Sequence, residues 1–172
     1  MAKQAMVEYA NMAAVKVVES AANTLTFKKL DTQVSITDKV AWLINRIQLV
    51  VDINATQWNA NLDSFKVALV RSNLLLDITD QTDAAVLWGM FAQRTDIGTA
   101  ATSWLLIEPF IFDFSTFPGG GILTPPTPLW GAVQGTSCTT AITAQLRIHY
   151  QPIQLADSEF WQLVESVRII SS

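Results

Sequence analysis

The sequence predicts an all-β fold, an antiparallel β-sandwich of about eight strands with one or two short helices. The first observation behind it is a period of two. Polar and apolar residues alternate without a break from Thr143 to Tyr150, as in a strand that is buried on one face. The second observation is that several such segments follow one another at fairly even spacing, which favours a sandwich or a barrel.

The candidate strands share this alternation or are apolar on both faces. In chain order they are residues 13–18, 24–28, 33–36, 40–53, 64–69, 104–112, 143–150 and 167–170. The candidate at 104–112 is apolar on both faces, as expected of a central strand. It is broken near Pro109, because proline cannot donate a hydrogen bond to the sheet.

Two segments are candidate helices. The first is a short helix that Asp157 could cap. One side of it would carry Phe160, Trp161 and Val164. The second could begin at residue 79 or 80, where apolar residues recur at helical spacing. Gly89 weakens the second prediction, so a strand over residues 86–91 stays an equal alternative.

A single domain is expected over residues 1–172, with a long Gly/Pro-rich loop at about 114–138. Five of the six prolines fall between Pro109 and Pro128, and loops of this length are uncommon in compact domains and often functional. The part from 114 to 130 is rich in large apolar side chains, which a solvated loop would not carry. It either folds back onto its own core or docks on a neighbouring subunit. The predicted assembly anchors are Phe117, Leu123, Leu129, Trp130 and, from the first helix, Trp161.

Charge is scarce in this chain. Charged residues make up only 15% of it, against about 25% in a typical soluble domain. We therefore expect partner subunits to cover part of the surface, the alternative being a well-packed monomer with uncharged polar residues outside. The net charge is −4 and no run of Lys or Arg occurs, so strong direct binding of nucleic acid is not expected.

Motifs for catalysis, metals and cofactors are missing from the sequence. His149 and Cys138 are the only residues of their kinds, too few for a typical metal site and for most nucleophile–base pairs. Asp77, Asp80 and Asp83 lie three residues apart, but a calcium loop needs a denser ligand set, so turns and caps are expected of them. We expect no enzyme activity, no metal and no cofactor. A hydrolase that uses two carboxylates is a third, weaker hypothesis.

The six tryptophans suggest an alternative function, that of a carbohydrate-binding β-sandwich module. Such a module would need at least two exposed, co-planar tryptophans with polar neighbours. Trp58 is the best exposed candidate because its neighbours in sequence are polar. Most of the tryptophans are expected to be core or interface anchors instead, since aromatic side chains dominate both.

Three stretches of the sequence together point to a family. They are Val18-Glu-Ser-Ala-Ala-Asn-Thr-Leu-Thr-Phe27 with Val40-Ala-Trp-Leu-Ile-Asn-Arg46, the segment Phe114 to Trp130, and Arg147-Ile-His-Tyr with Asp157-Ser-Glu-Phe-Trp-Gln-Leu-Val-Glu165. In these stretches the chain resembles the small single jelly-roll coat (capsid) proteins of icosahedral viruses, in style those of tailless phages and related environmental viruses. The likeness is one of pattern over most of the chain and includes no diagnostic motif.

The resemblance implies a single jelly roll, self-assembly into capsomers and a closed icosahedral shell. The implied location is the virion, after synthesis in the host cytoplasm, and the implied partners are copies of this chain, with a second coat protein left open. Such coats often carry a basic arm toward the genome, but the first 24 residues here hold only Lys3 and Lys16 as cations. That departure would suit a shell lined by a membrane or another protein, so membrane contact is expected only indirectly.

Overall fold

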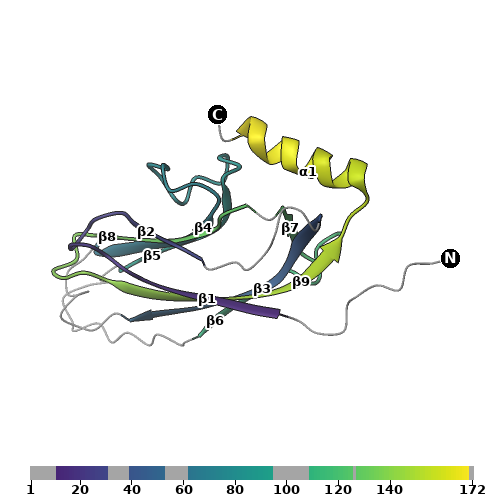
Figure 1. The fold of residues 1–172 in the computed structure, drawn as a ribbon. Helices are drawn as coiled ribbons and strands as arrows, with labels where there is room; N and C mark the ends of the chain where they lie inside the picture. Colours follow the sequence, from purple (N-terminus) through teal and green to yellow (C-terminus); the bar gives the residue numbers. More distant parts are fainter. Residues whose placement is uncertain (1–10, 31–38, 53–61, 95–108, 126, 171–172) are drawn as a thin grey trace.

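The computed structural model describes residues 11–30, 39–52, 62–94, 109–125 and 127–170, with the side chains of the last helix described as far as Ser166. In this part of the chain, nine strands form two antiparallel sheets that lie one over the other, and one helix follows the last strand (Figure 1). The elements are β1 (Asn11–Val18), β2 (Thr26–Lys29), β3 (Val40–Asp52), β4 (Ser64–Val70), β5 (Val86–Gln93), β6 (Phe110–Asp113), β7 (Ile122–Thr124), β8 (Trp130–Thr136), β9 (Thr143–Gln154) and α1 (Asp157–Ile170).

The order of the strands is that of a jelly roll. One sheet runs β1-β9-β3-β6, with the short β7 also beside β3, and the other runs β2-β8-β4-β5. The first four strands pair with later strands in reverse order: β1 with β9, β2 with β8, β3 with β6 and β4 with β5. A long antiparallel ribbon wrapped around itself leaves this set of pairs and divides into two facing sheets. The predicted antiparallel sandwich of jelly-roll type is therefore confirmed by the chain's own connectivity.

The core lies between the two sheets and follows the alternation of the strands. In β9, Ala144, Leu146 and Ile148 point into the core and are at most 1% exposed. From the opposite sheet, Phe65 and Val67 of β4 are fully buried in the same cluster. Because successive side chains of a strand point to opposite faces, each strand gives its other face to the outside of the sandwich.

Most predicted strands are found close to the expected positions. The confirmed candidates are 13–18 in β1, 24–28 in β2, 40–53 in β3, 64–69 in β4 and 143–150 in β9. The candidate at 33–36 and most of that at 104–112 lie outside the described residues. The strand β6 begins directly after Pro109, where the chain again offers an N–H group at every residue.

Of the two alternatives for residues 86–91, the strand is confirmed: residues 86–93 form β5, and no helix begins at residue 79 or 80. Gly89, which weakens a helix, here allows close packing, because a Cβ on it would come within 2.9 Å of the carbonyl oxygen of Ile78. Residues 167–170 continue α1 instead of forming a last strand, since extending a helix that already exists is far easier than starting a new element.

The predicted loop at 114–138 is a loop only in part. β7 pairs with β3, and β8 pairs with both β2 and β4, so two strands lie inside it. The prediction of a continuous loop failed because the glycines of β8 lie in a strand, where they allow close packing, and not in turns. A Cβ on Gly131 would come within 2.8 Å of Val15 and 2.9 Å of Val17, so glycine lets β1 and β8 approach each other across the core.

Helix α1 is held to the sandwich at its first turn. Lys39 forms an ion pair of 2.7 Å with Asp157, and the N–H of Leu155 donates to the carbonyl of Lys39 at 3.2 Å. The carboxylate of Glu159 accepts a hydrogen bond from the N–H of Ala156 at 3.2 Å, the contact that an acidic third residue makes in a capping box. The predicted helix is therefore confirmed, but Asp157 is its first residue and Ala156 stands at the capping position that was predicted for Asp157.

Candidate assembly surfaces

The predicted assembly anchors divide into core residues and exposed residues. Leu129 is 1% exposed and packs in the cluster between the two sheets, so the structure corrects its assignment as an anchor: its apolar surface is already buried in its own subunit. Leu123 and Trp130 are half-buried. Phe117 and Trp161 are each 53% exposed, and a neighbouring molecule could reach both.

The segment between β6 and β7 folds back onto its own subunit. The N–H of Phe117 donates to the carbonyl of Phe114 at 3.0 Å, and the N–H of Gly120 donates to the carbonyl of Phe117 at 2.8 Å. The buried Phe114 ring meets the Phe117 ring edge-on, with 5.5 Å between their centroids. A Cβ on Gly121 would collide with the carbonyl of Ile44, which shows how closely the segment lies on β3. Of the two phenylalanines in this segment, Phe117 is the one that a partner could reach, at 53% exposure.

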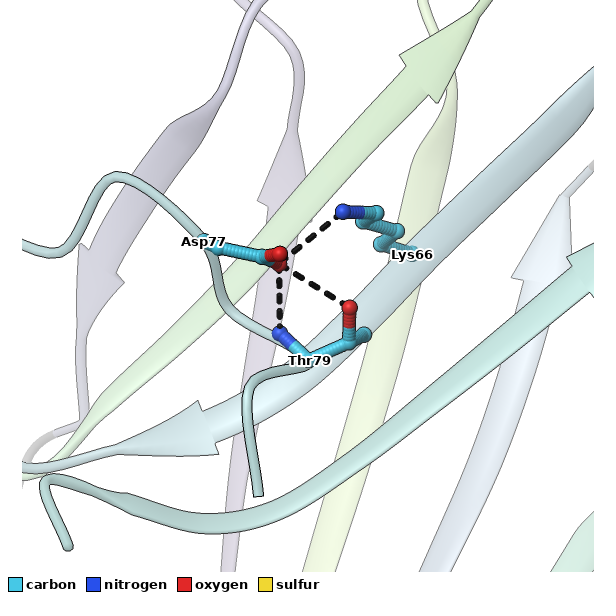
Figure 2. Close-up of polar contacts among 3 residues, drawn as sticks. All are labelled: Lys66, Asp77 and Thr79. Carbon is cyan, nitrogen blue, oxygen red and sulfur yellow. Dashed lines mark hydrogen bonds and ion pairs between the residues drawn. The ribbon is translucent and has the colours of Figure 1, made fainter. Parts of the chain in front are cut away.

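A second connection, residues 71–85 between β4 and β5, is tied to β4 by the carboxylate of one of its aspartates (Figure 2). One oxygen of Asp77 accepts hydrogen bonds from Nζ of Lys66 at 2.9 Å, from the N–H of Thr79 at 3.0 Å and from the Thr79 hydroxyl at 2.9 Å. The Lys66 contact and then the Thr79 contacts lower the pKa of Asp77 to about 2. The carboxylate therefore stays charged at neutral pH and ties the loop to β4.

The next two aspartates stabilise the same loop locally. The N–H and the hydroxyl of Thr82 donate to Asp80 at 2.9 and 2.6 Å, and the N–H of Ala85 donates to Asp83 at 2.8 Å. An aspartate that accepts from a backbone group two residues later forms an Asx turn. The turn role predicted for these aspartates is confirmed.

The middle of the loop is held by burial. Ile78 is fully buried in a small cluster on the outer side of the β2-β8-β4-β5 sheet. Gly89 of β5 lies beneath it, where a larger residue would meet the Ile78 carbonyl. At the start of the loop, the guanidinium of Arg71 donates to the carbonyl of Ala84 at 3.1 Å, and the N–H of Arg71 donates to the carbonyl of Ala85 at 2.8 Å. Both ends of the loop are thus closed against each other.

Two leucines of this fixed loop point into solvent. Leu74 is 83% exposed and Leu76 is 94% exposed, the largest values among the large apolar side chains of the described residues. Leaving such a side chain in water is unfavourable by about 1.5–3 kcal/mol relative to burying it. The sequence analysis overlooked both residues. The available signal was the run Leu74-Leu75-Leu76 between polar neighbours, which belongs to no strand candidate.

The opposite side of the molecule, the outer face of the β1-β9-β3-β6 sheet, gathers exposed cations. Lys16 of β1 and Arg147 of β9 are diagonal neighbours across their strand pair. Arg46 of β3 lies directly beside His149 of β9. Exposed apolar residues share this face: Met12 at 56%, Val18 at 49% and Ile111 at 55%. The sheet therefore presents a mixed surface of apolar residues and cations, with the carboxylates of Asp113 and Asp52 among them.

A shallow polar pocket of about 220 Å³ opens on this face, lined by Asn45, Arg46, Asp113, Ser115 and His149. Asp113 accepts from the N–H of Ser115 at 2.9 Å and pairs with Arg46 at 3.0 Å. Hydrogen bonds from Ser115 and then from Arg46 lower the pKa of Asp113 to about 2.

Nε2 of His149 is buried and finds no hydrogen-bond partner within the described residues. Burial, and then the charges of Arg46 and Arg147, lower the pKa of His149, so its ring is neutral at neutral pH.

A buried carboxylate closes one end of the sandwich. One oxygen of Glu19 accepts from the N–H of Gly135 at 2.6 Å, and the other accepts from the N–H of Ile142 at 2.7 Å. The nearby Cys138 is buried, and burial raises the pKa of its thiol, so it remains protonated at neutral pH. Because both oxygens of Glu19 are occupied by backbone groups, its role is structural.

No catalytic arrangement emerges in the part of the chain that the structure describes. Within it, no group of three or more His, Cys, Asp and Glu could hold a metal ion. Among the same residues, no helix has the length and apolar character needed to cross a membrane. The polar pocket holds one carboxylate, Asp113, which is paired with Arg46, whereas a two-carboxylate hydrolase needs a second acid facing the same space.

Of the tryptophans that the structure describes, only Trp161 is exposed. Trp42 and Trp88 are buried in the core, and the fourth is the half-buried tryptophan at the start of β8. Trp58, the candidate expected to be exposed, and Trp104 lie outside the described residues. The described surface therefore lacks the pair of exposed tryptophans that the carbohydrate-binding alternative requires.

No protein-family model matches the chain, and no curated protein matches it. Among solved structures, it is similar to a chain of tomato aspermy virus, with 14% identity over 91% of this chain and 85% of that one and a TM-score of 0.43. It is also similar to VP1 of Merkel cell polyomavirus, solved in complex with disialyllactose, with 8% identity over 84% of this chain and 78% of that one and a TM-score of 0.39. The assignment of the jelly roll rests on the order and pairing of this chain's own strands.

Proposed function

We propose that the chain is a structural viral coat subunit that self-assembles into capsomers and an icosahedral shell. The observation that carries the proposal is the exposure of Leu74 and Leu76, at 83% and 94%, on a loop that the subunit itself holds in place. A monomer gains nothing from fixing two leucines in water, whereas an assembled subunit buries them against a neighbour. The jelly roll is a fold in which viral coat domains occur, but the fold alone does not determine the function.

Exposed apolar residues on more than one side of the subunit support the same proposal. They occur on loop 71–85, on the outer face of the β1-β9-β3-β6 sheet, at Phe117 and at Trp161 of α1. A subunit in a closed shell contacts several neighbours through different surfaces, because one repeated contact alone gives a dimer, a ring or an open filament. Phe117 and Trp161 remain proposed anchors, with the half-buried Leu123 and Trp130 as less accessible ones.

The proposed partners are copies of this chain, and a second coat protein in the same virion is left open. Direct binding of the genome is not part of the proposal. Non-specific affinity for nucleic acid rises with the number of phosphates that cations neutralise, and the outer face offers Lys16, Arg147 and an Arg46 that is already paired with Asp113. Contact with a membrane would occur only through another layer of the particle.

Light scattering and electron microscopy of the purified full-length chain test the proposal. As protein concentration rises, we expect discrete oligomers and then closed particles of uniform size. A glycan array run on the same sample tests the carbohydrate-binding alternative. A chain that stays monomeric at high concentration and binds a glycan would replace the coat function with that alternative.

A further inference from the structure

We propose that loop 71–85 of one copy docks on the outer face of the β1-β9-β3-β6 sheet of a second copy. This inference rests on the proposed self-assembly and deepens it by naming the two surfaces that meet. In Figure 1 the loop rises beside β4 on one side of the sandwich, while β1, β9, β3 and β6 form the other side. Since the two surfaces face away from each other, a contact between them joins different copies head to tail, which is the kind of contact that continues from subunit to subunit.

The charges of the two surfaces are complementary. The sequence from 71 to 85 contains three aspartates and one arginine, and Asp80 is exposed on it. The sheet face presents Lys16 and Arg147, for which the described residues provide no ion pair; the acidic residues of this face are Asp113, which is paired with Arg46, and Asp52 at the end of β3. Opposite charges on two surfaces steer them together and fix their register.

The apolar residues are also matched. Leu74 and Leu76 are the most exposed apolar side chains of the described chain. On the sheet face, Met12, Val18 and Ile111 are each about half exposed, at 56%, 49% and 55%. Met12 and Val18 lie at opposite ends of β1 and Ile111 lies on β6, so a docked loop covers part of this set, and burial of that part is the main favourable term in most protein associations.

The sheet face has an unfilled polar site as well. Nε2 of His149 is buried at the pocket without a partner among the described residues, and a buried polar atom without a hydrogen bond is costly. A polar group from a docked copy that entered the pocket of about 220 Å³ would supply the missing hydrogen bond. The loop, fixed by Asp77 and by the buried Ile78, is already in a defined conformation, so docking orders little new chain.

Three variants of the full-length chain test the inference. The loop variant carries Leu74→Ser and Leu76→Ser, and the face variant carries Lys16→Glu and Arg147→Glu. The control, Leu62→Ser, changes a leucine of 56% exposure outside both surfaces. Sedimentation velocity measures self-association, and thermal unfolding checks that each variant is folded. We expect the loop variant and the face variant to associate on the order of a hundredfold more weakly than the wild type, and the control to associate as the wild type does.

Mixing the two defective variants is the decisive step. The loop variant keeps an intact face and the face variant keeps an intact loop, so the mixture should form one-to-one heterodimers that grow no further.

If the wild type assembles and both variants assemble equally well, the inference is overturned and the proposed function stands. If only the loop variant is defective, the loop meets some other surface and the inference is also overturned. If the two variants are defective but do not pair with each other, the two surfaces do not meet. A wild type that never assembles contradicts the proposed function itself.

Discussion

Two apolar connections of this jelly roll behave in opposite ways. The segment 114–130 buries Phe114 and Leu129 in its own core and adds the strand β7 to its own sheet. Loop 71–85 buries Ile78, packs Leu75 beside it and leaves Leu74 and Leu76 in solvent. Both connections contain large apolar side chains, but only the first uses all but one of its phenylalanines and leucines to complete the subunit.

The difference comes from what stabilises each connection. The segment 114–130 is held by apolar packing and by strand pairing with β3. Its apolar side chains are therefore largely buried in the contacts that hold it. Loop 71–85 is held by the aspartates Asp77, Asp80 and Asp83 and by Ile78 and Leu75, which pack on the sheet. Leu74 and Leu76 are therefore not needed for its conformation. A connection that polar contacts stabilise is free to present apolar residues to a partner.

The largest expected effect is the loss of a core residue in the first connection. Leu129→Ala should lower the free energy of unfolding by about 2–5 kcal/mol, because it leaves a cavity between the sheets. Chemical denaturation of the isolated subunit measures the change. Phe117→Ala, in the same segment but half exposed, is the matched control and should cost clearly less. Equal losses for the two variants would mean that the segment is not divided into buried and exposed parts.

The close approach of the same segment to β3 predicts the next effect. Gly121→Ala should cost about 1–3 kcal/mol, because the new Cβ collides with the backbone of Ile44. The control is Gly119→Ala, where a Cβ meets no atom within 4 Å but the backbone has φ of +88°, so a smaller cost of about 1 kcal/mol is expected. A neutral Gly121→Ala would show that the segment lies away from β3.

The carboxylate at the base of loop 71–85 predicts a smaller, pH-dependent effect. Asp77→Asn should destabilise the loop by about 0.5 kcal/mol, since a half-exposed ion pair is screened by water. The pKa of Asp77 is lowered from 3.8 to about 2, so the contribution is complete above the unfolded pKa and is lost as the pH falls through the folded one. Hydrogen exchange of the Thr79 amide measures it. A lower protection factor of this amide is expected in the variant at neutral pH and in the wild type at low pH; a protection factor that neither change alters would contradict this anchoring.

The smallest effect on the subunit is expected at the exposed leucines. Leu76→Ser should change the free energy of unfolding by no more than about 0.5 kcal/mol, because the side chain makes few contacts that the folded subunit would lose. Thermal unfolding under conditions that keep the protein monomeric measures it. A loss of several kcal/mol would show that Leu76 packs in its own subunit, and the contrast between the two connections would disappear.

The alternation of polar and apolar residues was sufficient to predict the all-β sandwich, because a strand with one buried face has an apolar residue at every second position. Prediction from the sequence failed where the role of a residue depends on a contact with a residue far away in the chain. Gly131 reads as a turn signal, but its role is to admit Val15 and Val17 across the core. The pairing that makes a jelly roll joins β1 to β9 across most of the chain, and no local pattern records which strand pairs with which.

The assembly surfaces were predicted less well than the fold. Composition led to the expectation that apolar surface is shared with partners; Phe117 and Trp161 are exposed, and their role as anchors stays a prediction. It could not indicate the direction of a side chain, so Leu129 was assigned to the wrong side and Leu76 was overlooked. The Asx turns of loop 71–85 can be recognised from sequence. Which side chains of the loop point into solvent depends on where Ile78 packs on β4 and β5, and the sequence alone does not give this.

Sedimentation velocity of the unmodified chain, measured from low to high protein concentration at constant salt, tests the central claim most directly. The account predicts that the subunit boundary is replaced by faster-sedimenting oligomers as the concentration rises. A single monomer boundary that persists to the highest concentration would contradict it.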